Sequence, residues 1–227
     1  MTPVERTALI TGGTGGLGRA VVAAFVAAGW RVVVPDKAPA PLEGAEVVEA
    51  DLGDLDAVAR VVETAAGHES TPLRAVVNLV GGFAADQPVA TTPVEGFEAQ
   101  FALNLRPTYL VTQAALPALV AAGGGSIVCM SSRSALYPFA GAAGYCASKA
   151  AVIAFVQVVA REHAADGVRC NAVLPSMVDT PANRASMPAE QHARLTPPEQ
   201  IASVIRFLCS DESVATTGAV IPVYGGP

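Results

Sequence analysis

Short apolar runs alternate with longer stretches of helical spacing along the whole chain. The short runs are nearly unbroken by polar residues, which is typical of strands buried on both faces, as in parallel sheets. The longer stretches repeat apolar residues every three or four positions, which predicts helices. The predicted strands are Thr7–Ile10, Arg31–Val34, Glu46–Glu49, Ala75–Val80, Ser126–Met130, Arg169–Val173 and Ala219–Val223. The predicted helices are Leu17–Ala28, Leu55–Ala66, Val94–Ala102, Pro107–Ala121, Tyr145–Ala165 and Pro198–Cys209.

This alternation predicts an α/β fold in which a doubly wound, Rossmann-like sheet of seven parallel strands has helices on both faces. One crossover differs from the others, since the segment Pro35–Ala45 carries three prolines and cannot hold a full helix. The sequence shows no linker, repeat or low-complexity tract. We therefore expect a single domain that spans residues 1–227.

The composition fits such a domain. Of the 227 residues, 52% are hydrophobic and 15% are charged, which is enough apolar material for a large core and unlike a disordered chain. The net charge is −6 and the 14 basic residues are scattered along the sequence. Neither a nucleic acid nor an anionic membrane is therefore expected as a partner.

We expect a cytoplasmic protein without a bound metal. The chain enters a strand-like run at Thr7, which leaves little room for a signal peptide. Charged residues and a glycine interrupt the apolar stretch Leu17–Val34, so it is not a membrane span. The cysteines and histidines show no metal-ligand spacing; they are Cys129, Cys146, Cys170, Cys209, His68, His163 and His192.

A glycine-rich turn, TGGTGGLG at Thr11–Gly18, follows the first predicted strand and opens the first helix. Glycines at such a turn let the backbone approach a pyrophosphate, and the helix N-terminus offers unpaired N–H groups. The spacing is G-x-x-x-G-x-G, which differs from the G-x-G-x-x-G fingerprint, and no Gly-Lys-Ser/Thr follows. The alternative is a flexible turn that binds nothing.

Acidic residues after the next two strands bear on this choice. Asp36 stands 18 residues beyond Gly18, where a carboxylate can hold an adenosine ribose, and it favours a dinucleotide site. Asp51 and Leu52 follow the third strand and could flank an adenine. Taken alone, Asp51 is also a candidate helix cap.

Tyr145 and Lys149 are four residues apart and therefore share one face of a predicted helix. An ammonium about 5 Å from a phenol stabilises the phenolate by roughly 3 kcal/mol at an effective dielectric near 20. That attraction would lower the pKa of the phenol by about two from its usual value near 10, which makes Tyr145 a candidate acid or base. The alternative is a lysine stem that lies over an aromatic ring.

Together these residues resemble the short-chain dehydrogenase/reductase family in its single-domain form. The resemblance extends from TGGTGGLG to VYGG at residues 223–226 and covers nearly the whole chain. It rests on a combination of motifs: the glycine turn, Asn104 in FALNL, Ser132 in IVCMSS, Tyr145 with Lys149, and PSMVDTP at 175–181. Ser132 lies 13 residues before Tyr145, which is the spacing expected in the family.

The resemblance implies hydride transfer between a nicotinamide cofactor and a carbonyl or alcohol. Tyr145 would be the general acid/base, Lys149 would lower its pKa and bind the nicotinamide ribose, and Ser132 would hold the substrate oxygen. Asn104 would position a water in a proton relay behind Lys149. The residues expected to bind the cofactor are Gly12, Thr14, Gly15, Gly16, Leu17, Asp36, Asp51, Leu52, Asn78, Gly81, Tyr145, Lys149, Pro175, Val178 and Thr180.

The sequence departs from the family at three places. Asn78-Leu79-Val80-Gly81 stands where the family has Asn-Asn-Ala-Gly, and Pro175-Ser176 stands where it has Pro-Gly. The short segment DTPANRASMP, residues 179–188, resembles dihydropteridine reductases of the same superfamily. A pterin reductase and a non-catalytic NAD(P)-binding regulator are therefore alternatives to an alcohol dehydrogenase or carbonyl reductase. Because Ser132, Tyr145 and Lys149 are all present, the regulator is disfavoured.

Asp36 also predicts the choice of cofactor. A carboxylate at this position accepts hydrogen bonds from the ribose of NAD and would repel the 2′-phosphate of NADP. Lys37 could pair with that phosphate only if its side chain turned back over the ribose. NAD is therefore expected, and NADP is the alternative.

The residues expected to form the substrate wall are apolar or aromatic, although each of them could equally be ordinary loop packing. They are Phe83, Leu136, Tyr137, Phe139, Met177 and Met187. The expected substrate is a small, uncharged, partly apolar ketone or secondary alcohol.

A further expectation concerns assembly. The segment Lys149–Ala160 is apolar on nearly every side of its helix, and one sheet can cover only one side. We therefore expect a homo-oligomer, and the family resemblance suggests a tetramer.

Overall fold

The computed structural model describes residues 6–84 and 87–225. Its seven strands form one sheet in the order β3-β2-β1-β4-β5-β6-β7, and all neighbouring strands are parallel. The prediction of a doubly wound, seven-stranded parallel sheet is therefore confirmed. The strands are β1 (Thr7–Thr11), β2 (Arg31–Asp36), β3 (Ala45–Glu49), β4 (Leu73–Asn78), β5 (Gly125–Met130), β6 (Val168–Pro175) and β7 (Val220–Val223).

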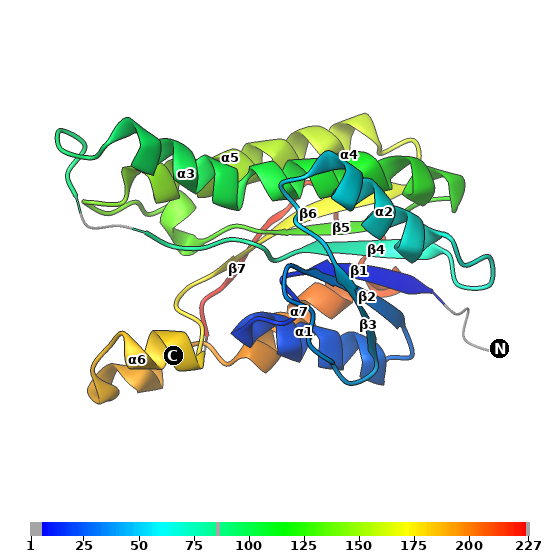
Figure 1. Cartoon of the computed structure of the whole chain (residues 1–227), viewed down its shortest axis with the longest axis horizontal. Helices are drawn as coiled ribbons and strands as arrows, with labels where there is room; N and C mark the ends of the chain where they lie inside the picture. The colour runs from blue at the N-terminus through cyan, green and yellow to red at the C-terminus, as the bar shows by residue number, and fades with distance from the viewer. Residues whose placement is uncertain (1–5, 85–86, 226–227) are drawn as a thin grey trace.

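Helices cover both faces of the sheet (Figure 1). One face carries α1 (Gly16–Ala27) and α7 (Pro198–Leu208), and the other carries α2 (Leu55–Ala66), α4 (Arg106–Ala121) and α5 (Ala143–Glu162). α3 (Val94–Asn104) packs on α4 and α5, outside the layer that touches the sheet. Short helices that the sequence did not predict are η1 (Arg133–Ala135), α6 (Pro181–Ala185), η2 (Ala189–Arg194) and η3 (Asp211–Ser213).

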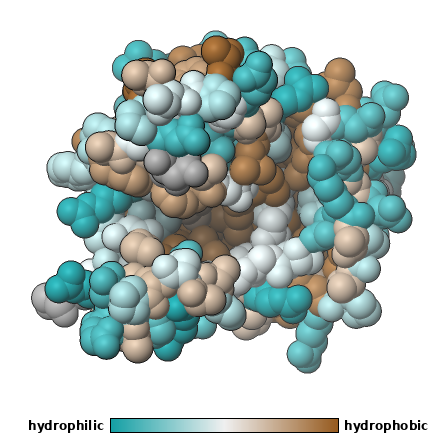
Figure 2. Space-filling model, turned by 60° about the vertical axis from the view of Figure 1, so that its left-hand side comes forward, coloured by the Kyte–Doolittle hydropathy of each residue, from teal (hydrophilic) through white to brown (hydrophobic). Residues whose placement is uncertain are grey.

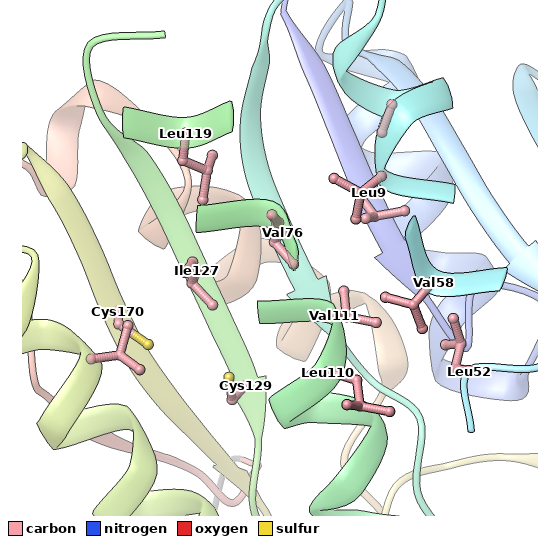
Figure 3. Packing of buried hydrophobic residues seen from close by; sticks show 14 of the residues in the cluster. Leu9, Leu52, Val58, Val76, Leu110, Val111, Leu119, Ile127, Cys129 and Cys170 are labelled. Atoms are coloured by element: carbon pink, nitrogen blue, oxygen red, sulfur yellow. The ribbon is translucent and has the colours of Figure 1, made fainter. Parts of the chain in front are cut away.

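Each face of the sheet has its own hydrophobic core. On the α2/α4/α5 side, Val58, Val111 and Val152 pack against inward residues of the strands, such as Val76 and Ile127. Figure 3 shows this cluster, with Leu9, Val76 and Ile127 on three neighbouring strands and Val58 and Leu110 facing them from helices. The strands are apolar on both faces because both cores use them, which is why their sequences lack alternation.

α5 is long and apolar enough, by length and composition alone, to cross a membrane. In the fold it is a core helix: Val152, Val156 and Val159 are buried in the hydrophobic cluster between the sheet and the α2/α4/α5 layer. Its apolar composition is thus explained on one side by packing on β5 and β6. The opposite side bears Val158, whose side chain is half exposed.

β1 and β4 are neighbours in the sheet although two strands and two helices separate them in sequence. Here the strand order reverses, and the loops after β1 and β4 leave the sheet in opposite directions, which opens a crevice at the carboxyl ends of the strands. The Thr11 hydroxyl accepts hydrogen bonds from the backbone N–H groups of Leu79 (3.1 Å) and Val80 (3.3 Å). β4 therefore ends at Asn78, two residues before the predicted end.

Candidate active site

A cavity of about 400 Å³ opens at this edge of the sheet. Its lining comes from the segments that follow β4, β5 and β6, from α5 and from α6, and it includes Ser132, Tyr145 and Lys149. Figure 2 shows the corresponding side of the molecule, hollowed in its middle, with hydrophobic residues at the bottom of the hollow. Three of the four predicted catalytic residues therefore lie on one cavity.

Ser132 and Tyr145 meet at the end of β5. Ser132 is in extended conformation after the strand and caps η1, because its hydroxyl accepts a hydrogen bond from the N–H of Ser134, 3.2 Å away. The same hydroxyl hydrogen-bonds the Tyr145 phenol and favours its ionised form. Phe83 packs edge-on against the Tyr145 ring, with ring centroids 4.9 Å apart. These contacts hold the phenol and the serine hydroxyl together at the cavity.

The pKa of Tyr145 contradicts one sequence prediction. Burial of the phenol raises its pKa above the usual value, and the hydrogen bond from Ser132 only partly offsets this. Lys149 was expected to lower that pKa, but its ammonium is directed to the carbonyl oxygen of Met130, 3.0 Å away. Burial also lowers the pKa of Lys149 itself to about 8. Helical spacing places the two residues side by side but does not show how strongly both are desolvated.

Asn104, the fourth predicted catalytic residue, is fully buried behind the cavity at the end of α3. Its Oδ1 accepts a hydrogen bond from the N–H of Gly82 (2.9 Å), and its Nδ2 donates one to the Ser148 hydroxyl (3.2 Å). A Cβ placed on Gly81 would lie 2.6 Å from Asn104 Oδ1 and 3.0 Å from Lys149 Nζ. The absence of a side chain at Gly81 therefore lets the amide and the ammonium approach the same strip of backbone.

The glycine turn fits the pyrophosphate of a dinucleotide. Gly12 has φ +67°, a conformation that favours glycine, and a Cβ on Gly18 would lie 2.0 Å from the Gly12 carbonyl oxygen. Gly15 and Gly16 lead into the N-terminus of α1, whose first N–H groups receive no side-chain cap. Leu17 follows them and lines the cavity. The turn thus offers a backbone without side chains in the way and the free N–H groups of a helix N-terminus, which are the features that a pyrophosphate site needs.

Asp36, the last residue of β2, lies beside this turn. Its carboxylate accepts hydrogen bonds from the Thr14 hydroxyl and from the N–H of Ala38 (2.8 Å). These two bonds, the Thr14 bond first, lower the pKa of Asp36 below its usual value. The group is therefore ionised at neutral pH and retains acceptor capacity for a ribose hydroxyl.

The two residues predicted to flank the adenine, Asp51 and Leu52, lie in different surroundings. Asp51 is exposed, accepts a hydrogen bond from the N–H of Gly53 and forms an ion pair with Lys37 Nζ at 2.9 Å. Leu52 is buried in the α2/α4/α5 core. The helix-cap alternative for Asp51 is wrong, because Asp54 caps α2 by accepting from the N–H of Ala57 at 2.7 Å.

The loop after β6 brings the remaining cofactor candidates to the same edge. Pro175 and Val178 line the cavity, and the Val178 carbonyl accepts a hydrogen bond from Asn183 Nδ2 at 2.7 Å. Thr180 caps α6 by accepting from the N–H of Asn183, and its methyl group covers Gly16, where a Cβ would lie 2.7 Å away. Asn78 instead turns into the core, where its Nδ2 donates to Thr112 at 3.1 Å.

A crevice at the strand-order switch, a glycine turn beside an ionised Asp36, and the Ser132/Tyr145/Lys149 group agree with one protein family. The sequence model of the short chain dehydrogenase family matches residues 6–191. The chain belongs to this family.

Relatives and solved structures agree over nearly the full length of this short-chain dehydrogenase. It is 34% identical to a mouse (3R)-3-hydroxyacyl-CoA dehydrogenase, with 96% of this chain and 95% of the relative aligned. It is 32% identical to the 3-oxoacyl-[acyl-carrier-protein] reductase MabA of Mycobacterium bovis, with 98% and 93% aligned. The structure of a short-chain type dehydrogenase/reductase from Mycobacterium ulcerans superimposes with a TM-score of 0.90 at 30% identity, covering 97% of this chain and 89% of that one. The chain is accordingly an oxidoreductase of the CH-OH/C=O class with a nicotinamide cofactor of the NAD(P) type.

Three of the six residues predicted for the substrate wall of this dehydrogenase line the cavity. Phe83, Phe139 and Met177 line the cavity, and the rings of Phe83 and Phe139 lie 6.2 Å apart. Leu136 and Tyr137 follow the single turn of η1 onto the surface and do not line the cavity, and neither does Met187. The turn of η1, which the sequence did not predict, carries the chain away from the cavity after Ser134.

Several cavity residues were missed from the sequence, and most of them are neighbours of predicted ones. They are Leu79, Gly82, Met130, Ser131, Arg133, Ser134, Ser176 and Asn183. Asn183 belongs to α6, whose signal was present: Thr180 followed by Pro181 is a helix cap with proline at the first helical position. Gly226, the last residue of the VYGG motif, lies outside the described residues.

Proposed function

We propose that this short-chain dehydrogenase interconverts a ketone and a secondary alcohol and uses NAD as its cofactor. Its catalytic residues would be Ser132, Tyr145, Lys149 and Asn104. The observation that carries the proposal is that Ser132, Tyr145 and Lys149 share one cavity with Leu17, Pro175 and Val178. We expect the second set to contact the nicotinamide. A redox-sensing regulator would need the second set but not the first.

The proposed chemistry divides between cofactor and protein. The bound nicotinamide supplies or accepts the hydride. In the direction of reduction, the Ser132 hydroxyl holds the substrate carbonyl oxygen and the Tyr145 phenol donates its proton to that oxygen as the alcohol forms. Burial keeps the pKa of the phenol above its usual value, so at neutral pH Tyr145 carries the proton that reduction needs.

Lys149 and Asn104 serve the return of that proton. The phenolate left on Tyr145 after transfer has to regain a proton, and the Lys149 pKa of about 8 lets its ammonium exchange a proton near neutral pH. Asn104 faces the same Gly81 backbone as Lys149, and its amide also reaches Ser148. The role of Asn104 is to position a water between the buried ammonium and solvent.

The proposal is tested by mixing the purified protein with a panel of ketones and secondary alcohols and either NAD(H) or NADP(H), and following absorbance of the reduced nicotinamide. Quinonoid dihydropterin belongs in the panel because residues 179–188 resemble pterin reductases. Turnover of a simple ketone or alcohol supports the proposal. Turnover of the pterin alone would assign the chain to that other activity, and cofactor binding without any turnover would favour a regulator.

A further inference from the structure

Arg133 lies directly after Ser132 and lines the same cavity. Its guanidinium carbon is 5.5 Å from the centroid of the Tyr137 ring and 5.2 Å from that of the Tyr224 ring. The two rings come from different parts of the fold, the loop after β5 and the end of β7. Contact with two aromatic faces holds a guanidinium through its π-system and leaves its edge N–H donors available.

The charges around the cavity are unbalanced. Among the described residues that line it, Arg133 and Lys149 are cationic and none is a carboxylate, although the whole chain carries a net charge of −6. Lys149 as a whole residue is 4% exposed, and its ammonium already donates to the Met130 carbonyl. Arg133 is therefore the exposed positive charge at the cavity wall within the part of the chain that the structure describes.

The hydrogen-bonding state of Arg133 distinguishes it from arginines that hold the fold together. Arg74 donates to the Ala122 carbonyl, and Arg169 donates to the carbonyls of Leu208 and Ser210. Over the described residues 6–84 and 87–225, Arg133 donates no side-chain hydrogen bond and forms no ion pair. The five N–H donors of the Arg133 guanidinium are thus positioned by aromatic rings and have no acceptor among the described residues.

We propose that Arg133 binds an oxyanion of the substrate, so that the substrate is a ketone or secondary alcohol that also carries a carboxylate or a phosphate. The inference rests on the proposed function, since Ser132 and Tyr145 would hold the carbonyl end of the same molecule. The planar guanidinium matches the geometry of either oxyanion. Phe83, Phe139 and Met177 contact the carbon skeleton between the two ends. The expectation of an uncharged substrate considered these apolar residues alone, and the proposal differs from it in adding the charge of Arg133.

Paired substrates test the inference. Acetoacetate, levulinate and 5-oxohexanoate are each compared with their methyl esters, and dihydroxyacetone phosphate is compared with dihydroxyacetone. In at least one pair the anionic member should have a kcat/KM about tenfold or more above the neutral member, because a hydrogen bond to a charged group is a strong one. The series of oxo acids varies the distance from carbonyl to carboxylate, and the phosphate pair distinguishes the two kinds of oxyanion.

Variants assign the effect to Arg133. Arg133→Gln should lower kcat/KM for the preferred anion by about tenfold or more and change the value for its neutral partner by less than about twofold. Arg133→Lys should recover part of the loss, since it keeps the charge but not the fork. Arg206→Gln, at an exposed arginine of α7, removes the same charge elsewhere and should leave both values unchanged. An equal loss for the anionic and neutral partners would overturn the inference and show that Arg133 only holds Tyr137 and Tyr224 in place.

A binding measurement separates this inference from the proposed function. Calorimetric titration with hexanoate and with hexanamide needs no turnover. If the wild type reduces no carbonyl but binds hexanoate more tightly than hexanamide, and Arg133→Gln removes the difference, the inference stands while the proposed function fails. If the two compounds give an equal response, or none, and no anionic carbonyl is preferred, the inference is wrong.

Discussion

The ammonium of Lys149 donates a hydrogen bond to the main-chain carbonyl of Met130 across 3.0 Å, and both residues line the candidate active-site cavity. This carbonyl belongs to the last residue of β5, and the Ser131 hydroxyl in turn donates to the Lys149 carbonyl at 2.8 Å. The lysine is thus tied to the end of the strand at both its backbone and its side chain. The position is exact, but the charge is nearly out of contact with water.

We expect this buried charge to destabilise the fold. Burial lowers the pKa of Lys149 from 10.5 to about 8, and at roughly 1.4 kcal/mol per pKa unit the cost of the charged form is about 3 kcal/mol below pH 8. Lys149→Met removes that cost and also the bond to Met130, which is worth about 1 kcal/mol. The variant should therefore be more stable than the wild type at pH 7 by about 1–2 kcal/mol in urea denaturation, while it loses turnover.

The pH dependence provides the control. Between pH 8 and 10.5 the unfolded chain still binds a proton at this lysine and the folded chain does not, so wild-type stability rises with pH in that window. Lys149→Met lacks this contribution. The stability advantage of the variant should accordingly shrink as the pH is raised from 7 to 10. An advantage that stayed constant would contradict the assignment of the cost to the ammonium.

Removal of the Tyr145 hydroxyl tests the proton donor. Tyr145→Phe keeps the ring that packs on Phe83 and removes only the group that reaches the Ser132 hydroxyl. A general acid contributes about 10²–10⁴-fold, so kcat should fall by at least about 100-fold. Cofactor binding, followed by protein fluorescence, should survive. A variant that retains more than about a tenth of the wild-type rate would exclude Tyr145 as the acid.

The sequence was informative wherever a periodic pattern determines position. Parallel strands end at one edge of a sheet, so the predicted doubly wound sheet brings together the segments after its strands, and Ser132, Pro175 and Gly81 do meet there. Helical spacing placed Tyr145 and Lys149 on one face of α5. These features follow from backbone geometry alone.

What the sequence could not show depends on burial and on specific partners. The direction of the Tyr145 pKa follows from desolvation, which spacing does not reveal. Lys37 pairs with Asp51, and no local pattern links residues 14 positions apart. Arg133 was passed over because a single arginine in a polar loop has no periodic signature; only the rings of Tyr137 and Tyr224 mark its position.

Assembly is expected through the outer faces of α4 and α5. Tyr109 and Val158 are about half exposed there, and the Tyr109 ring lies 5.8 Å from that of Phe155. Exposed apolar side chains on neighbouring helices favour an interface with a second copy. We expect a homo-oligomer, a tetramer in the first instance, by light scattering at micromolar concentration.

A charged substitution locates that interface. Val158→Arg should shift the protein to a smaller species, because it would bury an unpaired charge between copies. Val214→Arg is the matched control, since Val214 is 75% exposed and lies on the loop after η3. A wild type that is monomeric, or a Val158→Arg variant with unchanged mass, would count against this surface.

Cofactor preference depends on Asp36, whose carboxylate is ionised and held by Thr14 and Ala38 beside the glycine turn. A 2′-phosphate at this position would meet a negative charge, and Lys37, the next residue along the chain, is paired with Asp51 at 2.9 Å. We therefore expect a higher kcat/KM with NAD than with NADP.

Asp36→Ala removes both the ribose contact and the repulsion, so it should lower the value for NAD, raise it for NADP and narrow their ratio. Asp51→Ala is the informative companion: it leaves Asp36 in place but frees Lys37, and it should raise the kcat/KM for NADP relative to that for NAD. A wild-type preference for NADP of about tenfold or more, a difference of about 1.4 kcal/mol, would mean that Lys37 leaves Asp51 to bind the phosphate and that Asp36 does not govern the choice.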